Sequence, residues 1–208
     1  MKKTKVIAVL ALLLVAIGTA SAFKVLDSVT FFGGVSTMAN LETEGNSFDF
    51  SKLTLDLEFG VMEIMPNTDF PLRVFQYTSL TIPMSAENKI AASSVHTILG
   101  PLLKLHTKTR MEIGIGIGAA ARSYDWYLTI DNEDMKYTLT FMGFGALLDF
   151  QYTFEKACAI NFDLFGSYYL KSLYQLKDLY YPYRTRYESY QDIKYLKVGA
   201  SFGLSILF

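Results

Sequence analysis

The sequence predicts an all-β fold, an eight-stranded antiparallel up-and-down transmembrane β-barrel that follows a cleaved signal peptide. The first observation is composition: 51% of the 208 residues are hydrophobic and only 19% are charged, which is unusual for a soluble domain. The second is spacing, since after the first 23 residues no charge-free run reaches the roughly 18–20 residues of a membrane-spanning helix. Instead, apolar residues alternate with polar or small ones, as in β-strands with two different faces.

The N-terminal segment has the three parts of a secretory signal peptide, in order. Three lysines lie in the first five residues, 6–17 is an unbroken apolar run, and 18–22 consists of small residues and a threonine. Small residues stand where a signal peptidase would read them, and the apolar run is too short for a membrane anchor. We therefore expect cleavage after 1–22 and a mature barrel domain at 23–208.

Three segments alternate most clearly. In 53–61 the odd positions are apolar and the even positions are polar or small, and 112–122 repeats this pattern. In 196–208 one face is entirely apolar, and the other carries Lys, Gly and Ser apart from Leu207. The same signal predicts eight strands, at 24–36, 48–61, 71–83, 93–105, 110–123, 136–152, 159–172 and 191–208.

The connections between these strands carry turn chemistry. Gly45-Asn46 follows the first strand, Pro66-Asn67 the second and Asp131-Asn132 the fifth, and such pairs favour turns. The third and sixth strands alternate less cleanly than the others. We expect a bulge or a different register there.

Strands of this number and length suit a bilayer. Each exceeds the roughly 9–11 residues that a tilted strand needs to cross. Within lipid every backbone donor and acceptor must be paired, so a sheet can span only as a closed barrel. The two faces then place Leu, Ile, Val and Phe against lipid, and Gly, Ser and single charges inside. A soluble β-sandwich or lipocalin-like barrel is the alternative, since its strands also alternate.

The C-terminal segment resembles the β-signal of Gram-negative outer-membrane barrels, which has alternating apolar residues, an upstream glycine and a terminal aromatic residue. The matching residues are Val198, Gly199, Phe202, Leu204, Ile206 and Phe208. With the signal peptide and the eight alternating segments, the chain is similar to small eight-stranded barrels of the OmpA-transmembrane, OmpX and OmpW type. The resemblance implies residence in the cell outer membrane and contact with its lipid. It also implies a monomer, assembled by periplasmic chaperones and the barrel-assembly machinery.

A periplasmic N-terminus would fix the side of the membrane on which each connection lies. This class has short periplasmic turns and longer outer loops. The expected periplasmic turns are 62–70, 106–109 and 153–158. The expected outer connections are 37–47, 84–92, 124–135 and 173–190.

The polar faces of the predicted strands turn charged side chains toward the lumen. An eight-stranded barrel is just wide enough for its own side chains, and desolvating an unpaired charge costs several kcal/mol. We interpret these residues as an ion-pair network that plugs the barrel, with a gate or narrow solute path as the alternative. The candidate network consists of Asp56, Glu58, Lys104, Glu112, Arg122, Asp149 and Asp163. Lys171 and Lys197 are assigned to the same face.

The sequence gives little support to enzyme chemistry. Ser94 and His96 share a strand face, as a nucleophile and a base would in small outer-membrane barrels that deacylate lipid A, but this pair points inward. Gly116–Ala121 matches a loose dinucleotide fingerprint yet continues as a strand, so we expect its glycines to leave room for bulky side chains opposite. Cys158 is alone, and no Cys/His spacing suggests a metal. We expect no catalytic site, cofactor or metal.

Tyrosines gather near the C-terminus, where nine of the 14 lie between Tyr168 and Tyr195. Tyr168 and Tyr169 fit the aromatic girdle of a membrane interface. The segment 173–190 is too long for a tight turn, so it should project outward as a hairpin or loop. Because Tyr and Arg are enriched at binding hot spots, it is the candidate contact surface. Its residues are Tyr180, Tyr181, Tyr183, Arg184, Arg186 and Tyr187.

These features predict an integral outer-membrane barrel that is not an enzyme and has a structural or minor solute-conducting role. A surface interaction or adhesion protein that binds an extracellular ligand through 173–190 is the alternative, and a lipid-modifying enzyme is a weaker one. Removing the three signal lysines leaves 16 basic against 20 acidic residues. That balance argues against nucleic-acid binding, which needs a basic face.

Overall fold

The computed structural model describes seven stretches of the chain, and these residues form eight strands. The strands are β1 (Ser28–Asn40), β2 (Thr54–Met65), β3 (Leu72–Pro83), β4 (Ser94–His106), β5 (Met111–Ile130), β6 (Glu133–Glu155), β7 (Cys158–Asp178) and β8 (Thr185–Leu207). The described stretches are 26–41, 54–65, 71–84, 94–106, 110–130, 133–178 and 185–208. Within them, no helix has the length and apolar character needed to cross a membrane. The expected signal peptide, 1–22, lies outside them.

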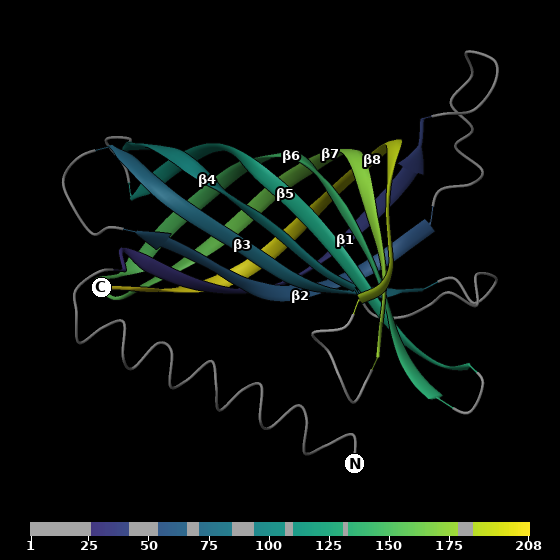
Figure 1. Cartoon of the computed structure of the whole chain (residues 1–208). Coiled ribbons are helices and arrows are strands. Elements are labelled where there is room, and N and C mark those ends of the chain that lie inside the picture. The colour runs from purple at the N-terminus through teal and green to yellow at the C-terminus, as the bar shows by residue number, and fades with distance from the viewer. Residues whose placement is uncertain are drawn as a thin grey trace.

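Antiparallel pairing between successive strands closes the sheet into a barrel (Figure 1). The last strand, β8, pairs with the whole length of β1, from Ser28 opposite Leu207 to Asn40 opposite Tyr195. Closure pairs the backbone groups of both terminal strands, as a sheet in lipid requires. The predicted eight-stranded antiparallel barrel is thereby confirmed.

The two ends of the barrel differ, and we name them by their connections. At the turn end lie the start of β1, the end of β8 and the β2–β3, β4–β5 and β6–β7 connections (Figure 1). The β6–β7 connection is a tight turn at Lys156 and Ala157. The remaining connections lie at the opposite end, which we call the loop end.

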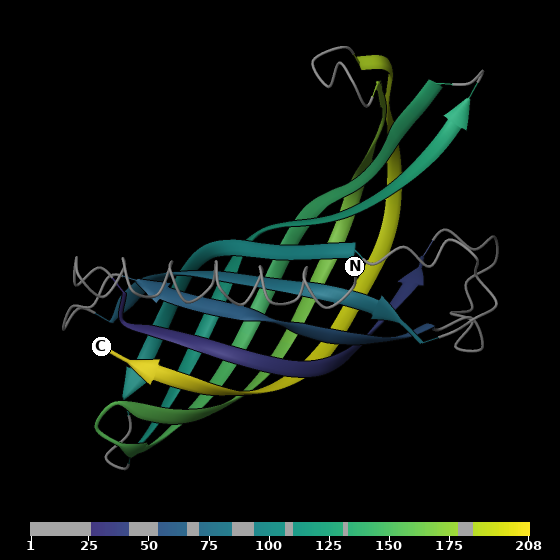
Figure 2. The same cartoon turned by 90° about the horizontal axis from the view of Figure 1, so that it is seen from below.

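Two hairpins at the loop end are longer than the sequence predicts. The β5–β6 ladder continues to Ile130 opposite Glu133, and the β7–β8 ladder continues to Lys177 opposite Thr185. Figure 2 shows these strands reaching past the ends of β1–β4. The expected connection at 124–135 is therefore wrong, because most of it is strand, whereas 173–190 forms the hairpin that was one of its two expected shapes. Beyond the barrel wall, both faces of a hairpin meet the same surroundings. Its strands therefore pair without the alternation of apolar and polar residues that marks a strand in the sequence.

Apolar side chains cover the outside of the barrel, and its inside carries a buried set of charged side chains. On β2, Phe59 is 51% exposed whereas the adjacent Glu58 is fully buried, and on β8 Phe202 is 57% exposed beside the buried Ser201. Exposed large apolar residues occur on every strand. A continuous band of this kind far exceeds the apolar patches that soluble monomers tolerate. It suits lipid instead, and the soluble-barrel alternative is wrong.

Two register shifts change which side chains face inward. One lies between Met142 and Gly143 in the β6–β7 pairing, where the ladder skips Leu170 of β7. Since β6 pairs regularly with β5, the irregularity expected in the sixth strand is a bulge of β7 instead. Another lies between Tyr169 and Lys171 in the β7–β8 pairing, after which Ser172 is buried and Lys171 is exposed. Placing Lys171 in the lumen is therefore wrong, because a bulge inserts one residue and reverses the faces that follow. The described part of β3, by contrast, keeps a regular register with both neighbours.

Candidate functional site

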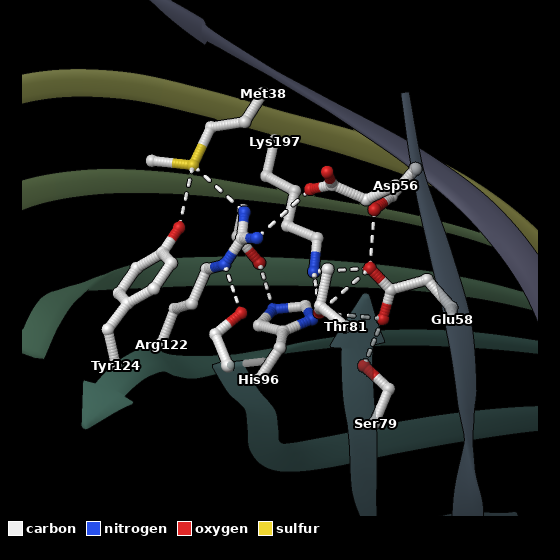
Figure 3. Close-up of polar contacts among 12 residues, drawn as sticks. Met38, Asp56, Glu58, Ser79, Thr81, His96, Arg122, Tyr124 and Lys197 are labelled. Atoms are coloured by element: carbon white, nitrogen blue, oxygen red, sulfur yellow. Dashed lines mark hydrogen bonds and ion pairs between the residues drawn. The ribbon is translucent and has the colours of Figure 1, made fainter. Parts of the chain in front are cut away.

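Glu58 of β2 lies at the centre of a group of buried polar side chains (Figure 3). Its carboxylate is 2.7 Å from Nζ of Lys197 on β8, and neither side chain has exposed surface. Thr81 donates to both carboxylate oxygens, at 3.0 and 3.1 Å, and Ser36 and Ser79 also donate to this carboxylate. A buried ion pair is tolerated when hydrogen bonds satisfy its remaining lone pairs, as these hydroxyl groups do.

Arg122 of β5 completes this group. Its Nη2 donates to Asp56 Oδ2 at 3.0 Å, and its Nε donates to Ser94 Oγ at 2.9 Å. Nη1 lies 3.0 Å from Met38 Sδ, and the guanidinium carbon lies 4.9 Å from the centre of the Tyr124 ring. The guanidinium group thus ties together β1, β2, β4 and β5. We call the four charged residues the central network: Asp56, Glu58, Arg122 and Lys197.

Lys104 of β4 anchors a second group, which we call the turn-end network. Its Nζ lies 2.8 Å from Asp27 Oδ2 and 2.9 Å from Glu112 Oε2. Arg73 Nε is 3.9 Å from Asp27, and His106 Nδ1 is 2.8 Å from Glu112 Oε1. The Lys104 and Arg73 side chains are 4% exposed, whereas the carboxylates of Asp27 and Glu112 are 17% and 20% exposed. This network therefore lies where the interior begins to meet solvent.

Asp149 of β6 and Asp163 of β7 form a third group. The two residues are directly opposite in the β6–β7 ladder, and both are fully buried. Asn161 Nδ2 donates to Asp149 Oδ1 at 2.7 Å, and Ser201 Oγ donates to Asp163 Oδ2 at 3.1 Å. The seven candidate lumen residues thus lie on the inner side of the barrel, in two ion-pair networks and one carboxyl pair.

Aromatic side chains that the sequence did not indicate also occupy the interior. The fully buried ring of Tyr77 on β3 stacks on Phe32 of β1 with ring centres 4.4 Å apart, and it contacts Phe165 of β7 at 4.9 Å. Phe165 in turn lies 5.7 Å from Lys197 Nζ. The weak alternation of β3 hid these inward positions, since its inner face carries aromatic rings among its polar residues.

Glycines on β5 and β6 make room for bulky side chains. A Cβ at Gly116 would lie 2.6 Å from the Phe75 ring, and one at Gly145 would lie 2.7 Å from Ile98. Gly118 instead closely approaches the backbone of β4. The glycine run on β5 was thus the sequence signal for large inward partners, although it did not identify them.

The candidate nucleophile and base do not act on each other. Ser94 accepts its hydrogen bond from Arg122, while His96 Nε2 lies 3.0 Å from Ser167 Oγ on the opposite side of the barrel. The His96 ring also packs 5.8 Å from Phe165. Each side chain has a packing role, and the two are not arranged as a nucleophile–base pair.

No protein-family model and no curated protein matches this sequence. Among solved structures, Neisserial surface protein A is similar at 9% sequence identity and a TM-score of 0.52, covering 87% of this chain and 96% of that one. The chain has the fold of a small outer-membrane β-barrel. A major outer membrane protein from Thermus thermophilus matches at 13% identity and a TM-score of 0.43, over 86% and 99% of the two chains. OprG from Pseudomonas aeruginosa matches at 13% identity and a TM-score of 0.39, over 88% of this chain and 97% of that one.

The outward apolar band and this fold together place the barrel in the outer membrane. Its candidate contact surface falls largely outside the described residues, namely Tyr180, Tyr181, Tyr183 and Arg184. Arg186 and Tyr187 belong to β8, and Tyr187 is 57% exposed. Tyr190 nearby is 61% exposed, and its hydroxyl donates to Glu188 at 2.8 Å, a hydrogen bond that raises the pKa of Tyr190.

The residues that resemble an assembly signal lie on β8 of the outer-membrane barrel, apart from Phe208, which directly follows this strand. Their large apolar members are exposed on the outer face: Val198, Phe202, Leu204, Ile206 and Phe208. Gly199 faces inward, where a Cβ would overlap the ring of Phe165 and lie 2.7 Å from the carbonyl oxygen of Val35. A side chain at this glycine would collide with the interior, so the position needs Gly for a reason separate from assembly.

Proposed function

We propose that this chain is a closed, non-enzymatic outer-membrane barrel with a structural role in the cell envelope. The observation that carries the proposal is the filled interior. The charged groups of the central network are 0–3% exposed, and the rings of Tyr77 and Phe165 cross the same space at 0% and 4% exposure. A solute path would have to break buried ion pairs, which costs about 3–5 kcal/mol for each pair broken.

The biogenesis that accompanies this role is part of the same proposal. Residues 1–22 direct export, and the outward apolar face of β8 docks on the barrel-assembly machinery after transfer by periplasmic chaperones. The alternation of β8 supports this, since its exposed residues form a row that a second strand or a lipid face could contact. Absence of enzyme chemistry is supported by the separate partners of Ser94 and His96.

Planar-bilayer recording tests the closed lumen. We expect the refolded wild-type barrel to give no current steps at neutral pH. The double variant Tyr77→Ala, Phe165→Ala removes two large rings from the interior while leaving the central network in place, and we expect it to conduct. A matched Phe59→Ala, Phe202→Ala variant, which shortens exposed rings, should stay silent. Current steps from the wild type would contradict the proposal.

A second candidate function is surface contact through the projecting hairpins. The β5–β6 and β7–β8 hairpins extend beyond the shorter strands (Figure 2), and Tyr187 and Tyr190 are among their most exposed large side chains. Exposed tyrosines supply a large contact area at little conformational cost, as in many binding surfaces. The ligand would be an extracellular molecule.

Deleting 176–186 tests this second function. We expect the deletion variant to fold as well as the wild type, with the same heat-modifiable migration in gel electrophoresis, because the hairpin tip adds no side chain to the central network. Binding of fluorescently labelled bacteria to host-cell or extracellular-matrix surfaces should fall at least several-fold if the tip is the contact surface. Unchanged binding by a folded variant would eliminate this function.

A further inference from the structure

Asp149 and Asp163 differ from the other acidic side chains of the described interior in lacking a basic partner. Asp27 and Glu112 share Lys104, Asp56 has Arg122, and Glu58 has Lys197, each within 3.0 Å. Among the described residues, no Lys or Arg lies within 4.0 Å of either Asp149 or Asp163. Two ionised carboxylates without a cation in a dry interior would each carry a desolvation cost of several kcal/mol.

In each of the two carboxyl groups, one oxygen accepts a hydrogen bond from a neighbouring side chain and the other does not. Asp149 Oδ1 accepts from Asn161 at 2.7 Å, and Asp163 Oδ2 accepts from Ser201 at 3.1 Å. The remaining oxygens, Asp149 Oδ2 and Asp163 Oδ1, are enclosed and have no donor among the described residues. The two residues are directly opposite in the β6–β7 ladder and neither has exposed surface, so the two enclosed oxygens belong to neighbouring carboxyl groups. Ionised carboxylates only accept hydrogen bonds, so a proton on one of the two groups is the donor that these oxygens lack.

The charged and titratable groups around the pair supply no substitute for that proton. The charges of Lys104 on β4 and Glu112 on β5 interact electrostatically with Asp149, and Tyr77 of β3 is near enough to interact with Asp163. The charge of Lys104 is already balanced by Asp27 and Glu112 at 2.8 and 2.9 Å. A bound metal ion would need more ligands, and the described residues hold no group of three or more His, Cys, Asp and Glu side chains that could bind one.

We propose that Asp149 and Asp163 form a proton-binding site that holds one shared proton in the folded barrel at neutral pH. The proton lies between Asp149 Oδ2 and Asp163 Oδ1 and joins β6 to β7 across the interior. Its loss at high pH leaves two facing carboxylates and pushes the two strands apart. The site makes barrel stability depend on pH, whether or not the lumen conducts.

The test compares urea unfolding of the wild type and Asp163→Asn, refolded in detergent micelles, from pH 5 to pH 9. The asparagine amide donates in place of the shared proton, so both folded barrels carry the same charge at this site. Unfolding of the wild type releases one proton, because isolated carboxyl groups ionise above about pH 4. The ratio of unfolding constants, wild type over variant, should therefore rise about tenfold per pH unit until the folded pair itself loses its proton.

Asp56→Asn is the matched control, since it also replaces a buried aspartate but leaves Arg122 without its ion-pair partner. We expect this control to raise the unfolding constant by roughly a hundredfold or more at neutral pH, and Asp163→Asn to leave it unchanged or lower. A ratio that does not change with pH would overturn the proposal, as would equal damage by the two substitutions. Stoichiometric metal in the purified wild type, with loss of stability on chelation, would also overturn it.

Infrared spectroscopy of the wild type keeps the proposal testable if a variant fails to fold. The folded barrel at neutral pH should show the carbonyl band of a protonated carboxyl group, shifted on transfer to deuterated water and lost on unfolding. The other buried acids are ion-paired and contribute no such band. Absence of the band from the folded protein would overturn the proposal.

Discussion

Lys197→Met is expected to lower the free energy of unfolding by about 3–5 kcal/mol, which is the cost of breaking a buried ion pair from one side. The substitution keeps the apolar stem of the side chain but leaves the Glu58 carboxylate with hydroxyl donors alone. Lys197 also lies 3.2 Å from Thr81 Oγ1, so a second hydrogen bond is lost. Equilibrium urea unfolding of the refolded barrel, followed by tryptophan fluorescence or electrophoretic mobility, measures the change.

The double variant Glu58→Gln, Lys197→Met separates the ion pair from general packing. Removing both charges should restore most of the lost stability, because no uncompensated carboxylate remains. Lys171→Met is the matched control on an exposed lysine, and we expect a change within about 0.5 kcal/mol. If Lys197→Met were as mild as Lys171→Met, the Glu58–Lys197 pair would contribute nothing to stability.

Phe75→Ala is expected to cost about 3–5 kcal/mol, as truncation of a fully buried aromatic ring usually does. Phe75 has no exposed surface and packs over Gly116, so no neighbouring Cβ can move in to fill the space. The same unfolding assay measures the loss. Phe75→Leu, which preserves much of the volume, should cost less than about 1.5 kcal/mol.

Adding Gly116→Val to Phe75→Ala tests the pairing of ring and glycine directly. In the wild type a Cβ at this position would lie 2.6 Å from the ring, so Gly116→Val alone should destabilise by about 1–3 kcal/mol through overpacking. In the Phe75→Ala background the same substitution should recover part of the loss. Additive costs for the two changes would show that the two positions do not share a space.

The strands and their outward faces were predictable because lipid imposes one simple rule on every residue of a spanning strand. Over 55–59 of β2 and 196–206 of β8, the apolar positions of the sequence are the more exposed positions of the structure, and the polar or small positions are the more buried ones. The rule fails where lipid no longer acts. The parts of the two hairpins beyond the barrel wall, such as 124–130 and 173–178, therefore carried no alternation that would mark a strand. Lys171 was assigned to the wrong face because the bulge at Leu170 of β7 reverses the alternation.

The partners inside the barrel were harder to predict, for a different reason. Which acid meets which base depends on the stagger of the strands around the ring, and alternation within one strand contains no information on it. Glu58 and Lys197 each stood out as an inward charge, but they belong to β2 and β8, and β1 lies between them. The pairing of Asp149 with Asp163 could not be predicted for another reason, because two acidic side chains are not expected to lie opposite each other.

The seam between β1 and β8 is a demanding step in the assembly of the barrel. Ser28 pairs with Leu207, near the other end of the described chain, and contacts so distant in sequence form slowly. The same closing step brings Lys197 to Glu58. A barrel in which β8 has not yet paired with β1 therefore has two open edges and leaves the Glu58 carboxylate without its lysine, and open edges are not tolerated in lipid. Charge neutralisation and edge closure thus happen together, when β8 pairs with β1.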